Sequence, residues 1–244
     1  MNVQRVAFIT FHACPLAAPG EGKSGGMNVY VRQLARALGD QGVKVDVFTR
    51  NHSTEADRIQ QVSPNVRVVH LPDGEPDAPL EGLFRNLPPF LEAVEEFQRK
   101  NRLAYQGVHS HYWLSGWVGK YLQQWWHVPH ITTFHTLGAV KNAIGIGEEE
   151  PELRIKSERD LAQNCQHIIA PTEKEKEELI RHYGAAPQKV SVVPCGVNLE
   201  LFQPVDKEIA KQQLGLVDDK VVLFVGRIEP LKGIAPLLEA VPYL

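Results

Sequence analysis

The sequence predicts an α/β protein built on a parallel sheet with helices on both of its faces. Short apolar runs alternate along the chain with segments of helical periodicity. The first of these runs, residues 6–11, is apolar along its whole length, which is typical of a strand buried on both faces, as in parallel sheets. Hydrophobic residues make up 43% of the 244 residues, enough for a sizeable core.

Seven strands are predicted before Pro194. They are residues 6–11, 43–49, 66–71, 108–111, 130–134, 167–170 and 190–193. Helices are expected at residues 27–38, 83–102, 113–126 and 154–165, and from Thr172 to about residue 183. Thr172 and Glu175 form a capping box, which predicts the start of that last helix. Ligands bind beyond the carboxyl ends of the strands in such sheets, so the loops of interest are 12–26, 109–113, 134–142 and 194–198.

A second unit is expected after Pro204. Helices are predicted at residues 207–214 and 234–241, with a buried strand at 221–225 between them. One strand cannot form an independent sheet. We therefore expect residues 1–204 to be one domain and residues 205–244 to be the incomplete start of a second α/β domain.

Charge and composition exclude several classes of protein. Lys and Arg number 26 against 29 Asp and Glu, which argues against a nucleic-acid partner. No apolar run approaches the roughly 18 residues that a membrane helix needs, and the first is too short for an export signal. Cys14, Cys165 and Cys195 lack metal-ligand spacing and fit a reducing compartment. The expectation is a cytoplasmic protein without a membrane span; a homodimer is left open.

Gly25 and Gly26 directly precede the predicted helix 27–38 and give the first phosphate signal. Unshielded backbone N–H groups at a helix N-terminus favour an anion by geometry and by dipole. Arg227 and Lys232 give the second, because both follow the predicted strand 221–225 and could clamp a diphosphate. Together they suggest a ligand held between two α/β domains.

The same glycine-rich loop permits two other interpretations. Gly20, Gly22 and Gly25 match the dinucleotide fingerprint, but eight residues separate Phe11 from Gly20, whereas the fingerprint needs its first glycine at the strand end. Residues 22–24 resemble the end of a P-loop, but Ala17 stands where that motif has its first glycine. Both alternatives are disfavoured.

His109, His111 and His135 could suggest a zinc site. The two on the predicted strand share a face, but cysteine ligands and a helical His pair are missing. The simpler interpretation is that one histidine packs beneath the sheet and another faces the cleft. No metal and no other cofactor is expected.

Five segments together resemble the retaining family-4 glycosyltransferases of the GT-B fold. They are residues 24–31, 109–116, 135–137, 194–198 and 225–232. Within that family the similarity is greatest to the mycothiol-pathway transferases that add N-acetylglucosamine to inositol phosphate; sucrose-phosphate synthases are more distant. The resemblance implies Rossmann-like domains and transfer from a UDP-sugar to a small hydroxylated acceptor, with or without a phosphate.

The resemblance also assigns site residues. His135 matches the family's active-site histidine, which contacts the donor sugar. Residues expected to bind the donor diphosphate are Gly25, Gly26, Arg227 and Lys232. Residues expected on the acceptor side are His12, Asn28, Tyr112, Thr136 and Arg154, the last supplying a guanidinium for the acceptor phosphate.

Two departures from the family pattern bear on function. The family's phosphate-binding Lys has no match, and Arg85 could replace it only with a one-residue shift. The chain also stops before the acidic motif that holds the donor's sugar and ribose, so we expect it to be weakly active or inactive by itself. A non-catalytic module that binds a sugar or a phosphate is the alternative.

Overall fold

The computed structural model describes residues 3–18, 25–51, 58–72, 80–146, 148–217, 219–226 and 228–243. The chain divides into two compact units. The first unit comprises Met1–Gly145 and Glu149–Pro194, and the second comprises Ile146–Glu148 and Cys195–Leu244. The domain boundary expected at residue 204 stays a prediction.

The first unit contains an eight-stranded sheet in the order β3-β4-β2-β1-β5-β6-β7-β8. Its strands are β1 (Arg5–Ile9), β2 (Lys44–Arg50), β3 (Ile59–Ser63), β4 (Val66–Leu71), β5 (Val108–His111), β6 (His130–Thr133), β7 (His167–Ala170) and β8 (Val190–Val192). All neighbours pair in parallel except β3, which is antiparallel to β4. The predicted α/β class with a parallel sheet is confirmed, and β3 is the strand that the sequence interpretation missed.

Helices connect the strands of the first unit. They are α1 (Gly26–Asp40), α2 (Leu80–Leu83), α3 (Leu87–Lys100), α4 (Trp113–Trp126), α5 (Gly138–Ile144), α6 (Glu152–Asn164) and α7 (Glu173–Tyr183). The helix predicted over 83–102 is interrupted by the 3₁₀ turn η1 (Phe84–Asn86). The α-helix restarts at Leu87, with proline in the first turn of α3, where a missing N–H costs nothing.

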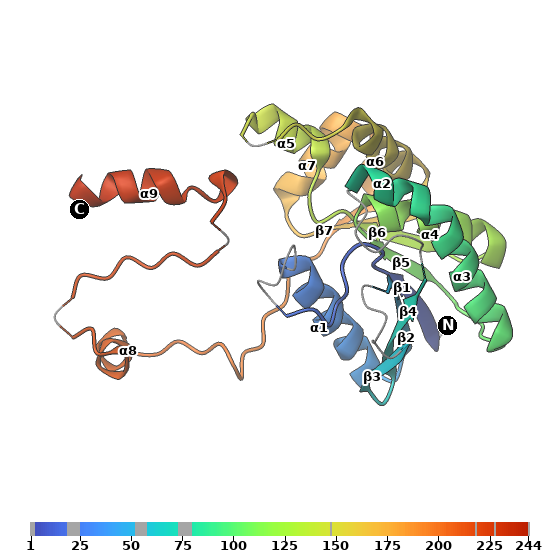
Figure 1. The fold of residues 1–244 in the computed structure, drawn as a ribbon, viewed down its shortest axis with the longest axis horizontal. Coiled ribbons are helices and arrows are strands. Elements are labelled where there is room, and N and C mark those ends of the chain that lie inside the picture. The colour runs from blue at the N-terminus through green and yellow to red at the C-terminus, as the bar shows by residue number, and fades with distance from the viewer. Residues whose placement is uncertain are drawn as a thin grey trace. The chain divides into compact units, whose positions relative to one another are not determined.

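Helices cover both faces of the sheet (Figure 1). Because successive strand residues point to opposite faces, Phe8 packs with Val31 and Ala35 of α1. Ala7 and Ile9, its neighbours along β1, belong instead to the core that includes α3 and α4. This alternation places α1 on one face of the sheet and α3 and α4 on the other.

The second unit contains α8 (Lys207–Leu214) and α9 (Ile234–Ala240), close to the predicted helices. The strand predicted at residues 221–225 is wrong: no strand is assigned there, and Leu223 and Val225 are 79% and 85% exposed. A strand needs a hydrogen-bonded neighbour, and the described part of this unit offers none. Every helix in the described ranges is too short or too polar to cross a lipid bilayer.

Candidate functional site

The site lies at the point where the strand order reverses. From β1 the chain runs to β2 and β4 on one side, and later to β5, β6, β7 and β8 on the other. In open α/β sheets this arrangement leaves a crevice beyond the carboxyl ends of the central strands. The segments that follow β1, β5 and β6 therefore meet there.

The N-terminus of α1 forms one wall of the crevice. Gly25 is its N-cap, and its N–H donates to Oδ1 of Asn28 at 3.3 Å, while the N–H of Asn28 donates to the Gly25 carbonyl at 3.1 Å. Nδ2 of Asn28 donates to the carbonyl of Cys14 at 2.6 Å. A Cβ atom added at Gly25 or Gly26 would meet nothing within 4 Å. The buried Asn28 amide thus holds the loop, and the glycine backbone stays accessible to a ligand.

Tyr30 connects this helix to His135. It lies one helical turn after Gly26, and its ring centroid is 5.2 Å from that of His135 in an edge-to-face arrangement. The structure therefore brings the glycines and His135 to the same edge of the sheet.

His135 follows β6 with a positive φ of 64°. Its Nε2 lies 3.1 Å from Nδ1 of His111, the last residue of β5. The ring of His109 contacts that of His111 in a tilted arrangement, with centroids 4.2 Å apart, and Nε2 of His109 lies 2.9 Å from Oγ1 of Thr133. His109 and His111 thus share the face of Phe8, as their spacing predicts.

Burial keeps these imidazoles neutral. Desolvation lowers the pKa of His109 to about 3 and that of His135 to about 4, and it lowers the pKa of His111 well below its usual value. His135 is only partly buried by its residue exposure, whereas His111 is fully buried. The group therefore ends in one neutral imidazole that reaches the crevice.

Tyr112 begins α4 with a positive φ of 77°. Its N–H donates to the carbonyl of Thr133 at 2.9 Å, so the turn stays tied to β6. Its ring centroid lies 4.3 Å from that of the His12 imidazole, and the guanidinium of Arg154 lies over the Tyr112 ring, 4.8 Å from its centroid. The cation–π contact places Tyr112 and Arg154 on one wall.

Arg154 is the centre of a buried charge network. It is 1% exposed, its Nε donates to Oε1 of Glu158 at 2.7 Å, and its Nη1 lies 2.7 Å from Oε2 of Glu150. Nη2 donates at 2.9 Å to both the carbonyl and the hydroxyl of Thr136. Burial lowers the pKa of the guanidinium, but the neighbouring carboxylates raise it more, so Arg154 stays charged.

Glu158 is the functional-site residue that the sequence interpretation missed. Fully buried, it accepts from Arg154, from the N–H of Gly138 at 2.9 Å and from the hydroxyl of Tyr183 at 2.5 Å. Tyr183 in turn accepts from the N–H of Ala139. Glu158 thereby caps α5 and fixes Arg154. The spacing of four residues between Arg154 and Glu158 on a helix was the available signal.

The structure gathers eight of the predicted residues around this edge of the sheet. They are His12, Gly25, Gly26, Asn28, Tyr112, His135, Thr136 and Arg154. Arg227 lies outside the described residues, as do Gly20 and Gly22 of the alternative nucleotide motifs. Lys232 is exposed in the second unit, in the 3₁₀ turn η3 (Pro230–Lys232), and Arg85 is exposed on η1.

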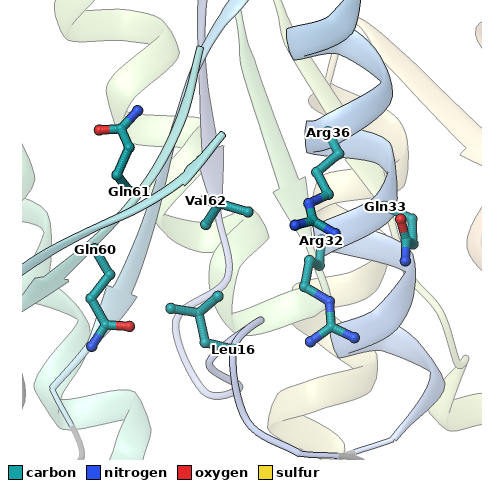
Figure 2. A pocket seen from close by; sticks show the side chains of 7 residues that line it. All are labelled: Leu16, Arg32, Gln33, Arg36, Gln60, Gln61 and Val62. Carbon is teal, nitrogen blue, oxygen red and sulfur yellow. The ribbon is translucent and has the colours of Figure 1, made fainter. Parts of the chain in front are cut away.

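A second hollow lies elsewhere on the first unit, between α1 and the edge strand β3 (Figure 2). Its lining residues are Leu16, Arg32, Gln33, Arg36, Gln60, Gln61 and Val62. In the sheet order β4 and β2 separate β3 from β1, and none of the site residues described above lines this hollow. Across the described residues, no three His, Cys, Asp or Glu side chains are grouped as metal ligands.

Residues 24–201 match the family described as Glycosyltransferase Family 4. The chain belongs to glycosyltransferase family 4. It is 44% identical to the D-inositol 3-phosphate glycosyltransferase of Geodermatophilus obscurus, over 97% of this chain and 54% of that protein. It is 40% identical to the Corynebacterium efficiens protein of the same name, over 98% of this chain and 58% of that protein. This family-4 chain thus spans a little over half the length of these relatives.

Solved structures of GT-B glycosyltransferases share the fold of this family-4 chain. The sucrose-phosphate synthase of Thermosynechococcus elongatus superposes with a TM-score of 0.89 at 36% identity, over 99% of this chain and 60% of that one. Anabaena HepE, in complex with UDP-glucose, gives a TM-score of 0.67 at 18% identity, over 98% of this chain and 57% of that one. The predicted GT-B type of fold and the predicted family are therefore both confirmed.

Proposed function

We propose that this chain forms the acceptor side of a retaining, metal-independent glycosyltransferase that moves a sugar from a UDP-sugar to a phosphorylated polyol. One observation carries the proposal: the open glycine backbone before α1, the neutral His135 and the guanidinium of Arg154 all lie beyond the central strands. The names of the relatives support an inositol phosphate as acceptor.

The donor diphosphate would lie against Gly25 and Gly26. Sugar transfer leaves a nucleoside diphosphate, so negative charge grows on the phosphate as the bond to the sugar breaks. Backbone N–H groups at the start of a fifteen-residue helix stabilise that charge without reorganising. The resemblance adds Arg227 and Lys232 as the cations that neutralise the diphosphate.

His135 would contact the donor sugar near the reacting carbon. That carbon gains positive charge as the leaving group departs. A protonated imidazole would repel this charge, whereas burial holds the pKa of His135 near 4 and keeps it neutral at physiological pH. A neutral imidazole can hydrogen-bond the sugar without that penalty.

The acceptor phosphate would bind at Tyr112, Thr136 and Arg154. The guanidinium already contacts the carboxylates of Glu150 and Glu158, and a phosphate could displace one of them more easily than the other. Glu158 is fully buried with three donors, whereas Glu150 is partly exposed and also pairs with Lys141. We therefore expect the phosphate to take the place of Glu150, exchanging one anion for another on Arg154.

Calorimetric titration of the chain with D-inositol 3-phosphate, myo-inositol and a hexose phosphate tests the acceptor. We expect D-inositol 3-phosphate to bind at least about tenfold more tightly than myo-inositol, the scale of one charge-assisted hydrogen bond. Thr136→Val removes a hydroxyl beside Arg154, so it should weaken the binding of D-inositol 3-phosphate and leave the binding of myo-inositol unchanged. Equal affinity for inositol and its phosphate would reject a phosphorylated acceptor. Tighter binding of the hexose phosphate would mean that the acceptor is a sugar phosphate and not an inositol phosphate.

A further inference from the structure

We propose that His111 is a positioning residue that holds His135 as the tautomer protonated on Nδ1, so that His135 offers an N–H donor to the sugar. The contact between Nδ1 of His111 and Nε2 of His135 carries this inference. The role of His135 toward the sugar rests on the proposed function. The assignment of the tautomer does not depend on that function.

The direction of the hydrogen bond follows from the other nitrogen of His111. Nε2 of His111 is buried and has no hydrogen-bond partner among the described residues. If His135 donated, the proton of neutral His111 would sit on this Nε2, as a buried N–H without an acceptor. Folded proteins rarely leave such donors unpaired, while an unpaired acceptor lone pair is better tolerated. His111 therefore donates from Nδ1, and Nε2 of His135 accepts.

The surroundings of His111 and His135 favour the neutral form of both imidazoles. The ring of His109 contacts that of His111 at a tilt, the Phe8 ring centroid lies 5.2 Å from that of His111, and Tyr30 of α1 meets both His111 and His135 edge-on. The pKa of each imidazole is lowered, first by burial and, for His111, then by its imidazole neighbours. Both rings are thus neutral at pH 7, with one proton each.

This hydrogen bond determines which nitrogen of His135 is available to a ligand. Its Nε2 is occupied by His111, so this nitrogen is not available as a general base. Its proton then resides on Nδ1, for which the described residues provide no partner. Because His135 is partly exposed, Nδ1–H is the donor left for a ligand hydroxyl or ring oxygen.

Long-range ¹H–¹⁵N correlation spectra of the uniformly ¹⁵N-labelled chain test the tautomer directly. We expect Nδ1 of His135 to have the chemical shift of a protonated nitrogen and Nε2 that of an unprotonated one, unchanged between pH 8 and pH 6. The opposite pattern, or exchange-averaged shifts for both nitrogens, would overturn the proposal.

Two variants separate the hydrogen bond from packing. His111→Asn keeps an N–H donor near the position of Nδ1 and should preserve the His135 pattern, whereas His111→Phe keeps a ring without a donor and should abolish it. His109→Phe is the matched control, because it changes the ring that contacts His111 but not the bond between His111 and His135. A His135 pattern that survives His111→Phe would show that His111 does not set the tautomer.

This readout is independent of sugar transfer and of ligand binding. If the spectra show the expected tautomer while no UDP-sugar or inositol phosphate binds, the positioning role stands and the proposed function fails. If ligands bind as proposed and the tautomer is reversed, only the positioning role fails.

Discussion

The apolar runs at residues 6–11 and 221–225 have nearly the same character, yet only the first lies in a sheet. β1 has β2 on one side and β5 on the other, and its last three residues are buried. Val221–Val225 pairs with no described strand, and four of its five side chains are exposed. An apolar run therefore becomes a strand because other strands pair with it, and apolar composition alone is not enough.

The same contrast extends to function. In the first unit, side chains from β5, β6, α4 and α6 converge because the sheet fixes their spacing. In the second unit, Lys232 stands exposed on a 3₁₀ turn with no such framework described. Tryptophan and histidine also occur only before residue 195, so tryptophan fluorescence and histidine titration report on the first unit alone.

The largest expected effect is loss of stability of the first unit in acid. Burial lowers the pKa of His109 and His130 to about 3 and that of His135 to about 4, so the unfolded chain binds more protons below about pH 6.5. The stabilisation is complete at neutral pH and declines by about 1.4 kcal/mol per pH unit for each imidazole. Burial raises the pKa of Glu175 to about 7, so protonation of this one carboxylate stabilises the folded state as the pH falls and offsets part of the loss.

Urea unfolding followed by tryptophan fluorescence at pH 7.5 and pH 5 measures this effect. We expect several kcal/mol less stability at pH 5, summed over the buried imidazoles. Equal stability at the two pH values would mean that these imidazoles are not buried in solution.

Removing the buried carboxylate in Glu158→Ala should cost about 3–5 kcal/mol of unfolding free energy, because it leaves the buried charge of Arg154 with one partner fewer. Lys156→Ala on the same helix removes an exposed pair with Glu152 and should cost less than about 1 kcal/mol. Chemical denaturation measures both. Similar costs for the two variants would show that the network is solvated.

One leucine-to-alanine change in each unit gives the most direct comparison of packing. Leu114 is fully buried in the first unit and Leu223 is 79% exposed in the second. Leu114→Ala should cost about 2–5 kcal/mol, and Leu223→Ala should stay within about 0.5 kcal/mol. A substantial cost at Leu223 would reveal packing of the second unit that its exposure does not show.

A smaller effect concerns ligand affinity. Glu150→Gln removes the carboxylate that an acceptor phosphate would replace on Arg154, so D-inositol 3-phosphate should bind up to about tenfold more tightly. Glu152→Gln, an exposed change on the same helix as Arg154, is the matched control and should leave affinity unchanged. Weaker binding by Glu150→Gln would show that Glu150 supports the ligand instead of competing with it.

Much of the first unit follows from local patterns. β4, β5, α4 and β7 begin and end at the predicted residues, because each is a compact segment bounded by polar or turn residues. β3 was missed because an edge strand pairs on one side only, so Ile59–Ser63 carries two glutamines and no continuous apolar run.

Contacts between distant segments explain the remaining differences. α5 is only seven residues long, and its first N–H is held by Glu158, twenty residues later. The contact of His111 with His135 depends on the register of β5 against β6, which no local pattern encodes. The family resemblance was enough to identify His135 and Arg154. Their partners His111 and Glu158 could be identified only from the fold.

The most direct test of the account is whether residues 1–194 hold the acceptor site alone. We would titrate residues 1–194 and the whole chain with D-inositol 3-phosphate by calorimetry, with tryptophan fluorescence confirming that both are folded. The account predicts the same dissociation constant for the two proteins, because every acceptor-side residue lies in the first unit. Loss of binding by a folded 1–194 protein would contradict it.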